Sequence, residues 1–259
     1  LSAAIGRNGL DDALASFGPD SPFTCLKTNG EGKDPDEFYS LVPYEKGFLF
    51  VTLLEQTVGR EQFDQFIKKY IRHFSFSSIT TEQFEEFLEK ELPGVAAQVG
   101  AQEWIRRPGV PKNAPNFSSA RLEHLKGLAA GWTGGARPEV AAAKQWKPED
   151  WQIFLQALPR QLPAADCAWL DDNFQLTKHG NCEILCNWLT IAAGSGYAAT
   201  RPRTRAFLGE VGRMKYLKPL YTALHRNAET RALAKETFAE HGGGYHPIAR
   251  GGIERILAG

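Results

Sequence analysis

Helical periodicity is the feature of this 259-residue sequence that most limits the folds open to it. Over residues 61–74, apolar side chains recur at the three- and four-residue intervals that place them on one helix face. They are Phe63, Phe66, Ile67, Tyr70 and Phe74. A second helix is predicted after Thr80, because Thr80 and Gln83 match a capping box and Pro93-Gly94 would end it. No stretch shows sustained two-residue alternation, so we predict an all-α fold.

The run at 47–54 is apolar on every side, which fits either a buried strand or a buried helix. Glu55 and Gln56 continue the run without a turn signal. We therefore predict a buried helix for this segment.

A proline-rich break divides the sequence at 107–117. Three prolines fall within eight residues, where they remove backbone donors and disfavour helix in the residues before them. We predict a semi-rigid extended linker here, with one unit at 1–106 and a second at 118–259. Beyond the linker, short amphipathic helices are predicted around Leu122, Trp151, Leu185, Lys215, Thr230 and Ile248. Short helices joined by short loops favour a HEAT- or armadillo-like α-solenoid.

Composition excludes several function classes. The 30 basic and 30 acidic side chains leave no net charge, which argues against nucleic acid or an anionic membrane surface as a partner. No apolar run approaches the roughly 20 residues needed to cross a bilayer. The four cysteines show no framework spacing, so we expect a reduced, cytoplasmic setting. The start lacks both a signal-peptide pattern and a methionine, and we expect it to lie inside a longer protein.

The sequence contains no recognisable metal-binding motif. None of its six histidines belongs to a His-Glu-x-x-His pattern. His179, Cys182 and Cys186 form the one close His/Cys group, but a fourth ligand is missing. Because cysteine is a common small buried residue, we favour packing over metal binding here and predict no metal ligand in this chain.

The segment 34–47 is the most informative for chemistry. Pro43 fits the first turn of a helix, where its missing N–H leaves no bond unmade. Tyr44 would then lie near the helix N-terminus, a place that favours negative charge, and its phenol could donate a hydrogen bond to a developing oxyanion. The alternative is a half-buried tyrosine that packs at a helix start, and the physics of the segment alone favours this alternative.

Residues 39–47, Tyr-Ser-Leu-Val-Pro-Tyr-Glu-Lys-Gly, resemble the YxxVPYEKG signature of leukotriene A4 hydrolase and its aminopeptidase relatives. Residues 74–81 resemble the family's FSYKSITT stretch, and Trp104 with 108–111 resembles its W-x-x-x-PGLPP linker. Residues 212–220 resemble GRMKFTRPL. These matches run in family order over nearly the whole chain, and they reverse the preference at Tyr44.

The resemblance implies a fold and a set of roles. Residues 1–106 would be the helical remnant of a thermolysin-like catalytic domain, and the zinc ligands of the longer enzyme would lie upstream of this chain. Tyr44 matches the tyrosine that stabilises the tetrahedral oxyanion, and Tyr39 matches a neighbour lining the same pocket. Asp36 matches an aspartate that directs water in epoxide-hydrolysing members. Asp36 is also a residue type favoured as a helix cap.

Arg213 and Lys215 match the basic pair that binds the substrate carboxylate in this family. A guanidinium offers a planar two-point fork and an ammonium a compact charge, so both suit one carboxylate. The alternative is an ordinary solvated basic cluster. The resemblance further implies that the linker brings Arg213 within reach of the pocket of Tyr44.

The function implied by the resemblance is that of a cytoplasmic zinc aminopeptidase acting on peptides, with hydrolysis of a fatty-acid epoxide as a second activity. This chain alone, without the upstream catalytic part, is expected to be inactive. The alternative is a non-catalytic helical scaffold for protein–protein interaction. A scaffold has no need of a phenol and a carboxylate clamp in their family context, which favours the enzyme.

Overall fold

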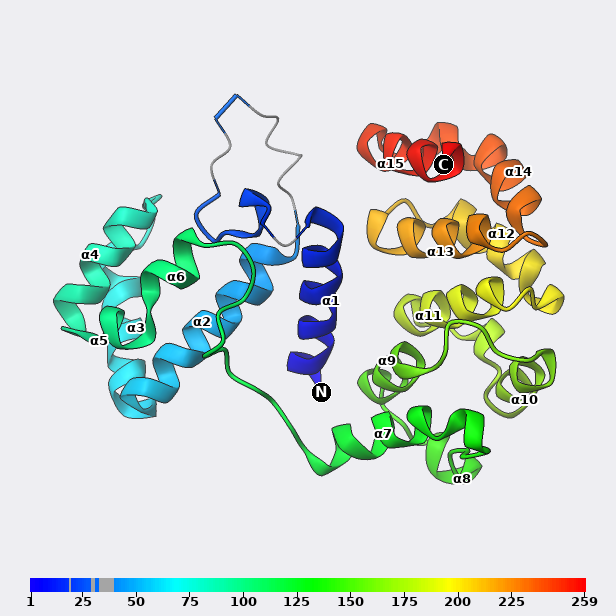
Figure 1. Cartoon of the computed structure of the whole chain (residues 1–259), viewed down its shortest axis with the longest axis horizontal. Coiled ribbons are helices and arrows are strands. Elements are labelled where there is room, and N and C mark those ends of the chain that lie inside the picture. Colours follow the sequence, from blue (N-terminus) through cyan, green and yellow to red (C-terminus); the bar gives the residue numbers. More distant parts are fainter. Residues whose placement is uncertain (19, 29–30, 33–39) are drawn as a thin grey trace. The chain divides into compact units, whose positions relative to one another are not determined.

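The computed structural model describes the 259-residue chain except for residues 19, 29–30 and 33–39 (Figure 1). Every regular element in the described part is an α-helix or a short 3-10 helix, so the all-α prediction is confirmed. The chain forms two compact units, an N-terminal unit at Ser2–Phe117 and a C-terminal unit at Ser118–Gly259. Within the described residues, no helix combines the length and the apolar character needed to cross a membrane.

The N-terminal unit is built from six α-helices and one 3-10 turn among its described residues. They are α1 (Ser2–Phe17), η1 (Pro22–Thr24), α2 (Val42–Val58), α3 (Arg60–Phe74), α4 (Thr81–Glu91), α5 (Val95–Val99) and α6 (Ala101–Arg106). Helix α2 packs against α1, α3 and α5. It is therefore the central element of this unit, and it carries residues 42–47 of the family signature.

The capping box predicted at Thr80 is present. The Thr80 hydroxyl accepts a hydrogen bond from the Gln83 amide at 3.3 Å, and the Gln83 side chain accepts one from the Thr80 amide at 2.8 Å. At the other end α4 stops at Glu91, and Gly94 follows with a φ of 78°, a left-handed conformation that glycine adopts without strain. The local signals read from the sequence are sufficient to fix this helix.

The apolar run at 47–54 lies within α2, as predicted, but it is not buried on every side. Leu49, Phe50 and Leu54 enter the core, whereas the side chains of Phe48 and Val51 are 44% and 40% exposed. A helix at the surface of a unit presents only part of its circumference to the core, even when all its faces are apolar. The prediction of a helix rather than a strand is confirmed, and the helix is buried along part of its surface.

The proline-rich segment contains no helix between Arg106 and Ala120. It is attached to the N-terminal unit through the side chain of Asn113, whose Oδ1 atom accepts a hydrogen bond from the Trp104 indole at 3.1 Å. The Nδ2 atom of Asn113 in turn donates to the Val99 carbonyl at 2.9 Å. These bonds hold the segment on the core around Trp104, which is fully buried.

The C-terminal unit is a succession of short helices (Figure 1). Its α-helices are α7 (Ala120–Ala130), α8 (Val140–Ala143), α9 (Pro148–Ala157), α10 (Ala164–Phe174), α11 (Cys182–Gly194), α12 (Arg201–Glu210), α13 (Met214–Arg226), α14 (Arg231–His241) and α15 (Pro247–Ala258). Its 3-10 turns are η3 (Trp132–Gly134), η4 (Leu176–Lys178), η5 (Ala198–Thr200) and η6 (Gly242–Gly244).

Alternate helices of this unit stack in order. Helix α7 packs on α9, α9 on α11, α11 on α13 and α13 on α15, while α12 packs on α14. This is the layered arrangement of an α-solenoid. The helices predicted around Leu122, Trp151, Leu185, Lys215, Thr230 and Ile248 are all present, whereas α8, α10 and α12 were not predicted.

Candidate functional site

Tyr44 lies in the exposed first turn of α2. Helix α2 begins at Val42, and Pro43 occupies the first turn, where its missing N–H is tolerated. The Tyr44 side chain is 59% exposed, and Phe48 and Val51 follow it at helical spacing on the same side. Tyr44 therefore lies in the turn that carries the partial positive charge of a helix N-terminus and is followed by exposed apolar residues, a suitable place for a donor to a developing anion.

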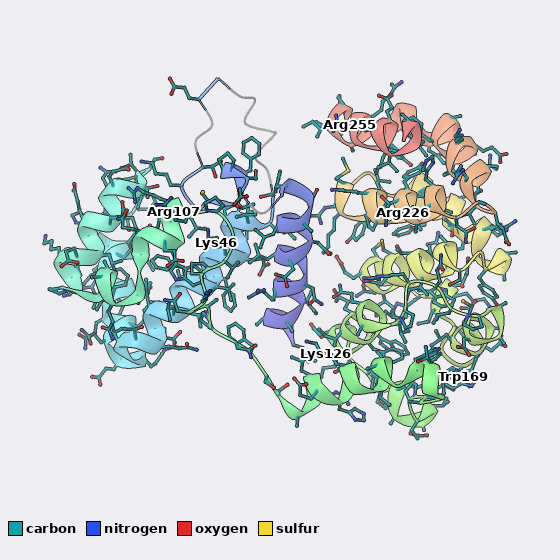
Figure 2. All side chains as sticks on the ribbon, in the orientation of Figure 1. Lys46, Arg107, Lys126, Trp169, Arg226 and Arg255 are labelled. Atoms are coloured by element: carbon teal, nitrogen blue, oxygen red, sulfur yellow. The ribbon has the colours of Figure 1, made fainter. Side chains whose placement is uncertain are left out.

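Lys46, two residues beyond Tyr44, is fully buried. Its ammonium group donates to the carbonyl of Thr24 at 3.0 Å and to the carbonyl of Arg107 at 2.8 Å. Figure 2 labels Lys46 and Arg107 in the N-terminal unit. Burial lowers the pKa of Lys46 to about 8, and the nearby charges of Cys25 and Glu103 act in the opposite direction. Sequence reasoning did not single out this residue, because an isolated lysine in a helix is normally exposed.

The bonds of Lys46 join three parts of the N-terminal unit. Thr24 ends the 3-10 turn η1, and Arg107 is the first residue after α6. Two further hydrogen bonds join the region of η1 to the end of α6 and the residues after it. The Gly109 amide donates to the Thr24 hydroxyl at 3.0 Å, and the Lys27 amide donates to the Ile105 carbonyl at 2.8 Å. Lys46 thus fixes the beginning of α2, and with it the turn that carries Tyr44, to the start of the proline-rich segment.

Asp36 and Tyr39, the other two residues predicted for the catalytic site, lie outside the described residues. Their predicted roles stay predictions. The hydroxyl of Ser40, directly after them, accepts a hydrogen bond from the Val42 amide at 3.2 Å and so supports the start of α2.

Arg213 and Lys215 lie together at the start of α13. Arg213 is the N-cap residue with an exposed side chain, and Lys215 is in the first turn. The Lys215 ammonium donates to Glu183 Oε1 at 2.6 Å, and the Tyr216 hydroxyl donates to the same oxygen at 2.7 Å. The structure thus brings the predicted basic pair together and adds Glu183, a carboxylate that the sequence did not indicate.

Tyr44 belongs to the N-terminal unit, and Arg213 and Lys215 belong to the C-terminal unit. The expectation that these residues face one cavity stays a prediction. Each half of the predicted site nevertheless has defined local geometry, since Tyr44 lies on α2 and the basic pair lies at the start of α13.

The residues present do not fit a zinc site. In the described part of the chain, no three His, Cys, Asp or Glu side chains are grouped closely enough to hold a metal ion. Burial raises the pKa of the Cys186 thiol to about 12, which opposes the thiolate that a metal requires. The Nδ1 atom of His179 accepts a hydrogen bond from the Asn181 amide at 3.0 Å. The Cys186 thiol also donates a hydrogen bond to the Tyr216 carbonyl at 3.7 Å, a contact within the fold.

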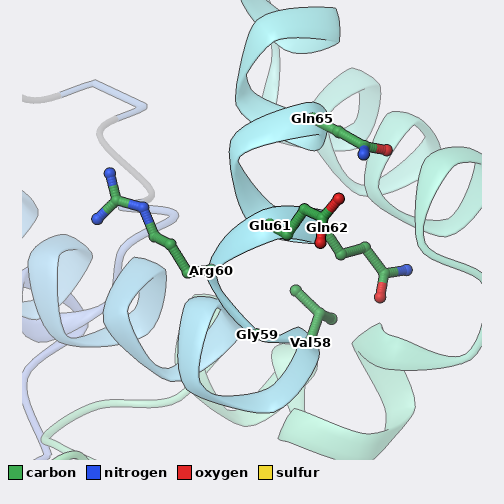
Figure 3. Close-up of a pocket in the computed structure, with 6 residues that line it drawn as sticks. All are labelled: Val58, Gly59, Arg60, Glu61, Gln62 and Gln65. Atoms are coloured by element: carbon green, nitrogen blue, oxygen red, sulfur yellow. The ribbon is translucent and has the colours of Figure 1, made fainter.

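A shallow hollow of about 400 Å³ lies where α2 passes into α3 (Figure 3). Its lining residues are Val58, Gly59, Arg60, Glu61, Gln62 and Gln65. None of the predicted catalytic or anchoring residues lines it. It is open to solvent and carries the charged side chains of Arg60 and Glu61, unlike the enclosed and mostly apolar lining typical of a pocket for small molecules, so we assign it no role in the site.

Two family models match the chain. One, described as the peptidase family M1 domain, matches residues 10–104, and the other, described as leukotriene A4 hydrolase, C-terminal, matches residues 146–257. Leucine aminopeptidase 2 of Ajellomyces capsulatus is 31% identical over 272 residues, covering 100% of this chain and 43% of that protein. Leucine aminopeptidase 2 of Pyricularia oryzae is 33% identical over 269 residues, covering 99% of this chain and 43% of that protein.

Solved structures show the same fold. Yeast LTA4 hydrolase in complex with bestatin matches with a TM-score of 0.86 and 26% identity, over 99% of this chain and 45% of that one. The native enzyme from Saccharomyces cerevisiae matches with a TM-score of 0.76 and 27% identity, again over 99% of this chain and 45% of that one. The chain thus spans less than half the length of these relatives.

Proposed function

Because the chain belongs to the family of M1 peptidases that includes leukotriene A4 hydrolase, we propose that it contributes two parts of an aminopeptidase active site. Tyr44 stabilises the transition state of peptide hydrolysis, and Arg213 with Lys215 binds the carboxylate of the peptide. The activity belongs to a longer protein of about twice this length, as in the relatives. Its metal centre is held by residues outside this chain.

The position of Tyr44 is the observation that carries this proposal. When water attacks a peptide carbonyl, the carbonyl oxygen gains negative charge only on the way to the tetrahedral intermediate. A donor already in place for that charge lowers the barrier without strengthening substrate binding. Tyr44 has an exposed phenol in the first turn of α2, and the helix N-terminus adds a favourable potential for an anion.

The relatives indicate the substrate to test first. Two of them are leucine aminopeptidases by name, so peptides with an N-terminal leucine are the first choice. The two solved structures are those of a yeast LTA4 hydrolase, which supports hydrolysis of a fatty-acid epoxide as a second activity of the longer protein. A fatty acid, like a peptide, carries a carboxylate that Arg213 can bind with its two-point fork.

The first test is Tyr44→Phe in the longer protein. The phenyl ring keeps the packing of the side chain and removes only the donor, so we expect turnover of a leucyl peptide to fall about 100- to 1,000-fold with little change in KM. The measurement is steady-state kinetics, with circular dichroism and metal content compared between the variant and the wild type.

Tyr70→Phe is the matched control. Its ring packs among Phe66, Phe74 and Phe87 on α3 and α4. We expect the turnover of this variant to equal that of the wild type. An unchanged turnover number in Tyr44→Phe would remove Tyr44 from the mechanism. Absence of peptide cleavage by the wild-type longer protein would instead favour the helical scaffold.

A further inference from the structure

The first turns of α11 and α13 meet at a three-residue cluster. Glu183 is the second residue of α11, and Lys215 and Tyr216 lie in the first turn of α13, which packs directly on α11. One oxygen of Glu183 accepts hydrogen bonds from both the Lys215 ammonium and the Tyr216 hydroxyl, at 2.6 and 2.7 Å. We call Glu183, Lys215 and Tyr216 the Glu183 clamp.

The clamp is fixed by its surroundings as well as by its own bonds. The Asn181 side chain accepts hydrogen bonds from the amides of Glu183 and Ile184, which holds the first turn of α11. The Tyr216 ring packs against the ring of Phe207 with centroids 6.0 Å apart. Burial, as the largest cause, and the hydrogen bond to Glu183, as the next, raise the pKa of Tyr216 to about 12. The hydroxyl of Tyr216 therefore remains a donor at neutral pH.

The clamp divides the basic pair into two unlike cations. The Lys215 ammonium already has a carboxylate partner, whereas Arg213 has no ion pair among the described residues. Arg213, Lys215 and Glu183 together carry a net charge of +1, whereas Arg213 and Lys215 alone would carry +2. An incoming carboxylate therefore meets one available guanidinium and one ammonium that is shared with Glu183.

We infer that Glu183 is a specificity-determining residue, which weakens the binding of substrate carboxylates by competing for Lys215. This inference rests on the proposed function of Arg213 and Lys215. Glu183 acts in two ways, since it occupies donors of Lys215 and its own negative charge repels a carboxylate bound nearby. The effect of Glu183 is confined to ligands that carry a negative charge at the end bound by Arg213 and Lys215. The binding of a peptide with a neutral C-terminal amide should not depend on Glu183.

The test is Glu183→Gln in the longer protein. Glutamine has nearly the same shape and keeps an oxygen that accepts the Tyr216 hydrogen bond, but it carries no charge. We expect KM for a leucyl peptide with a free C-terminal carboxylate to fall about fivefold, the factor that one unit charge exerts on another at ~4 Å in water. Turnover should be unchanged, and KM for the C-terminal amide of the same peptide should not move.

One further variant separates charge from structure. Glu240→Gln removes one carboxylate that pairs with Arg205 elsewhere in the same unit, and it should leave the KM values for both peptides unchanged. A rise in KM, or no change, in Glu183→Gln would overturn the inference, since either result would mean that Glu183 orients Lys215 or does nothing.

A binding measurement separates this inference from the proposed function. N-acetylglycylglycine and its C-terminal amide are titrated into the 259-residue chain, and the arginine Nε–Hε signals are followed by NMR. We expect the carboxylate to bind about fivefold more tightly to Glu183→Gln than to the wild type. A longer protein that cleaves no peptide would refute the proposed function, while this titration would still decide the role of Glu183. Equal affinities for the two proteins would refute that role.

Discussion

Lys46 places an ammonium group inside the N-terminal unit without a carboxylate partner among its hydrogen bonds. Both of its acceptors are backbone carbonyls, those of Thr24 and Arg107. A buried charge that is compensated only by dipoles favours its neutral form, which is why the pKa falls from 10.5 to about 8. Because the bonds of Lys46 hold the first turn of α2, the protonation of Lys46 affects how that turn, and with it Tyr44, is held in place.

The first prediction at this scale concerns pH and stability. Between pH 8 and 10.5 the unfolded chain keeps the proton of Lys46 while the folded chain loses it, so the contribution of Lys46 to the free energy of unfolding rises with pH. This contribution is present above pH 10.5 and is lost as the pH falls through about 8. The free energy of unfolding of the wild type, measured relative to that of Lys46→Met, should rise by about 2 kcal/mol between pH ~7.5 and ~9.5.

Urea unfolding of both proteins at the two pH values provides the measurement. The exposed Lys68 on α3 is the matched control. The difference in the free energy of unfolding between the wild type and Lys68→Met should change far less between the two pH values. If the difference between the wild type and Lys46→Met is independent of pH, the ammonium group of Lys46 is not desolvated as the geometry implies.

The residues that sequence reasoning missed are those whose roles depend on distant partners. Tyr44, Arg213 and Lys215 could be proposed from the sequence because each lies in a short contiguous motif. Lys46 is buried only because η1 and the end of α6 meet at α2. Glu183 lies 32 residues before Lys215, and no local spacing rule joins the first turns of α11 and α13. Pairings of this kind follow from packing, which a single sequence does not encode locally.

At the scale of elements, α4 shows how local chemistry fixes a helix boundary. The backbone N–H groups of Thr80 and Gln83 have no acceptor within the helix, and each donates to the side chain of the other residue. We expect Thr80→Ala to lower the free energy of unfolding by about 1 kcal/mol, because the Gln83 amide loses its acceptor. Chemical denaturation measures the change. Ser78→Ala, an exposed change before the cap, should stay within about 0.5 kcal/mol of the wild type, and an equal effect of both would deny the cap its role.

Helices without such signals were harder to predict. Helix α4 has its cap, and α13 has apolar residues repeating along one face, with Leu217, Leu220 and Leu224 buried. Helices α10 and α12 bury few side chains, among them Cys167 and Leu170 in α10. Their apolar faces are too short to produce a clear period, and tertiary packing against neighbouring helices supplies most of their stability.

At the scale of the whole molecule, the residues proposed for catalysis and anchoring belong to two compact units. Tyr44, the proposed oxyanion donor, belongs to the N-terminal unit, and Arg213 and Lys215, the proposed carboxylate anchor, belong to the C-terminal unit. The relatives, which are about twice as long, match this chain along nearly its whole length. That continuity supports the proposal that the two units act together on one peptide.

The most direct test of this claim is the substrate discrimination of Arg213→Gln in the longer protein. The variant and the wild type are assayed with one leucyl peptide as its free carboxylate and as its C-terminal amide. Loss of a charge-assisted bond should lower kcat/KM for the carboxylate about 10- to 100-fold and leave kcat/KM for the amide unchanged. Equal effects on the two peptides, or no effect on either, would contradict the claim that Arg213 serves the site of Tyr44.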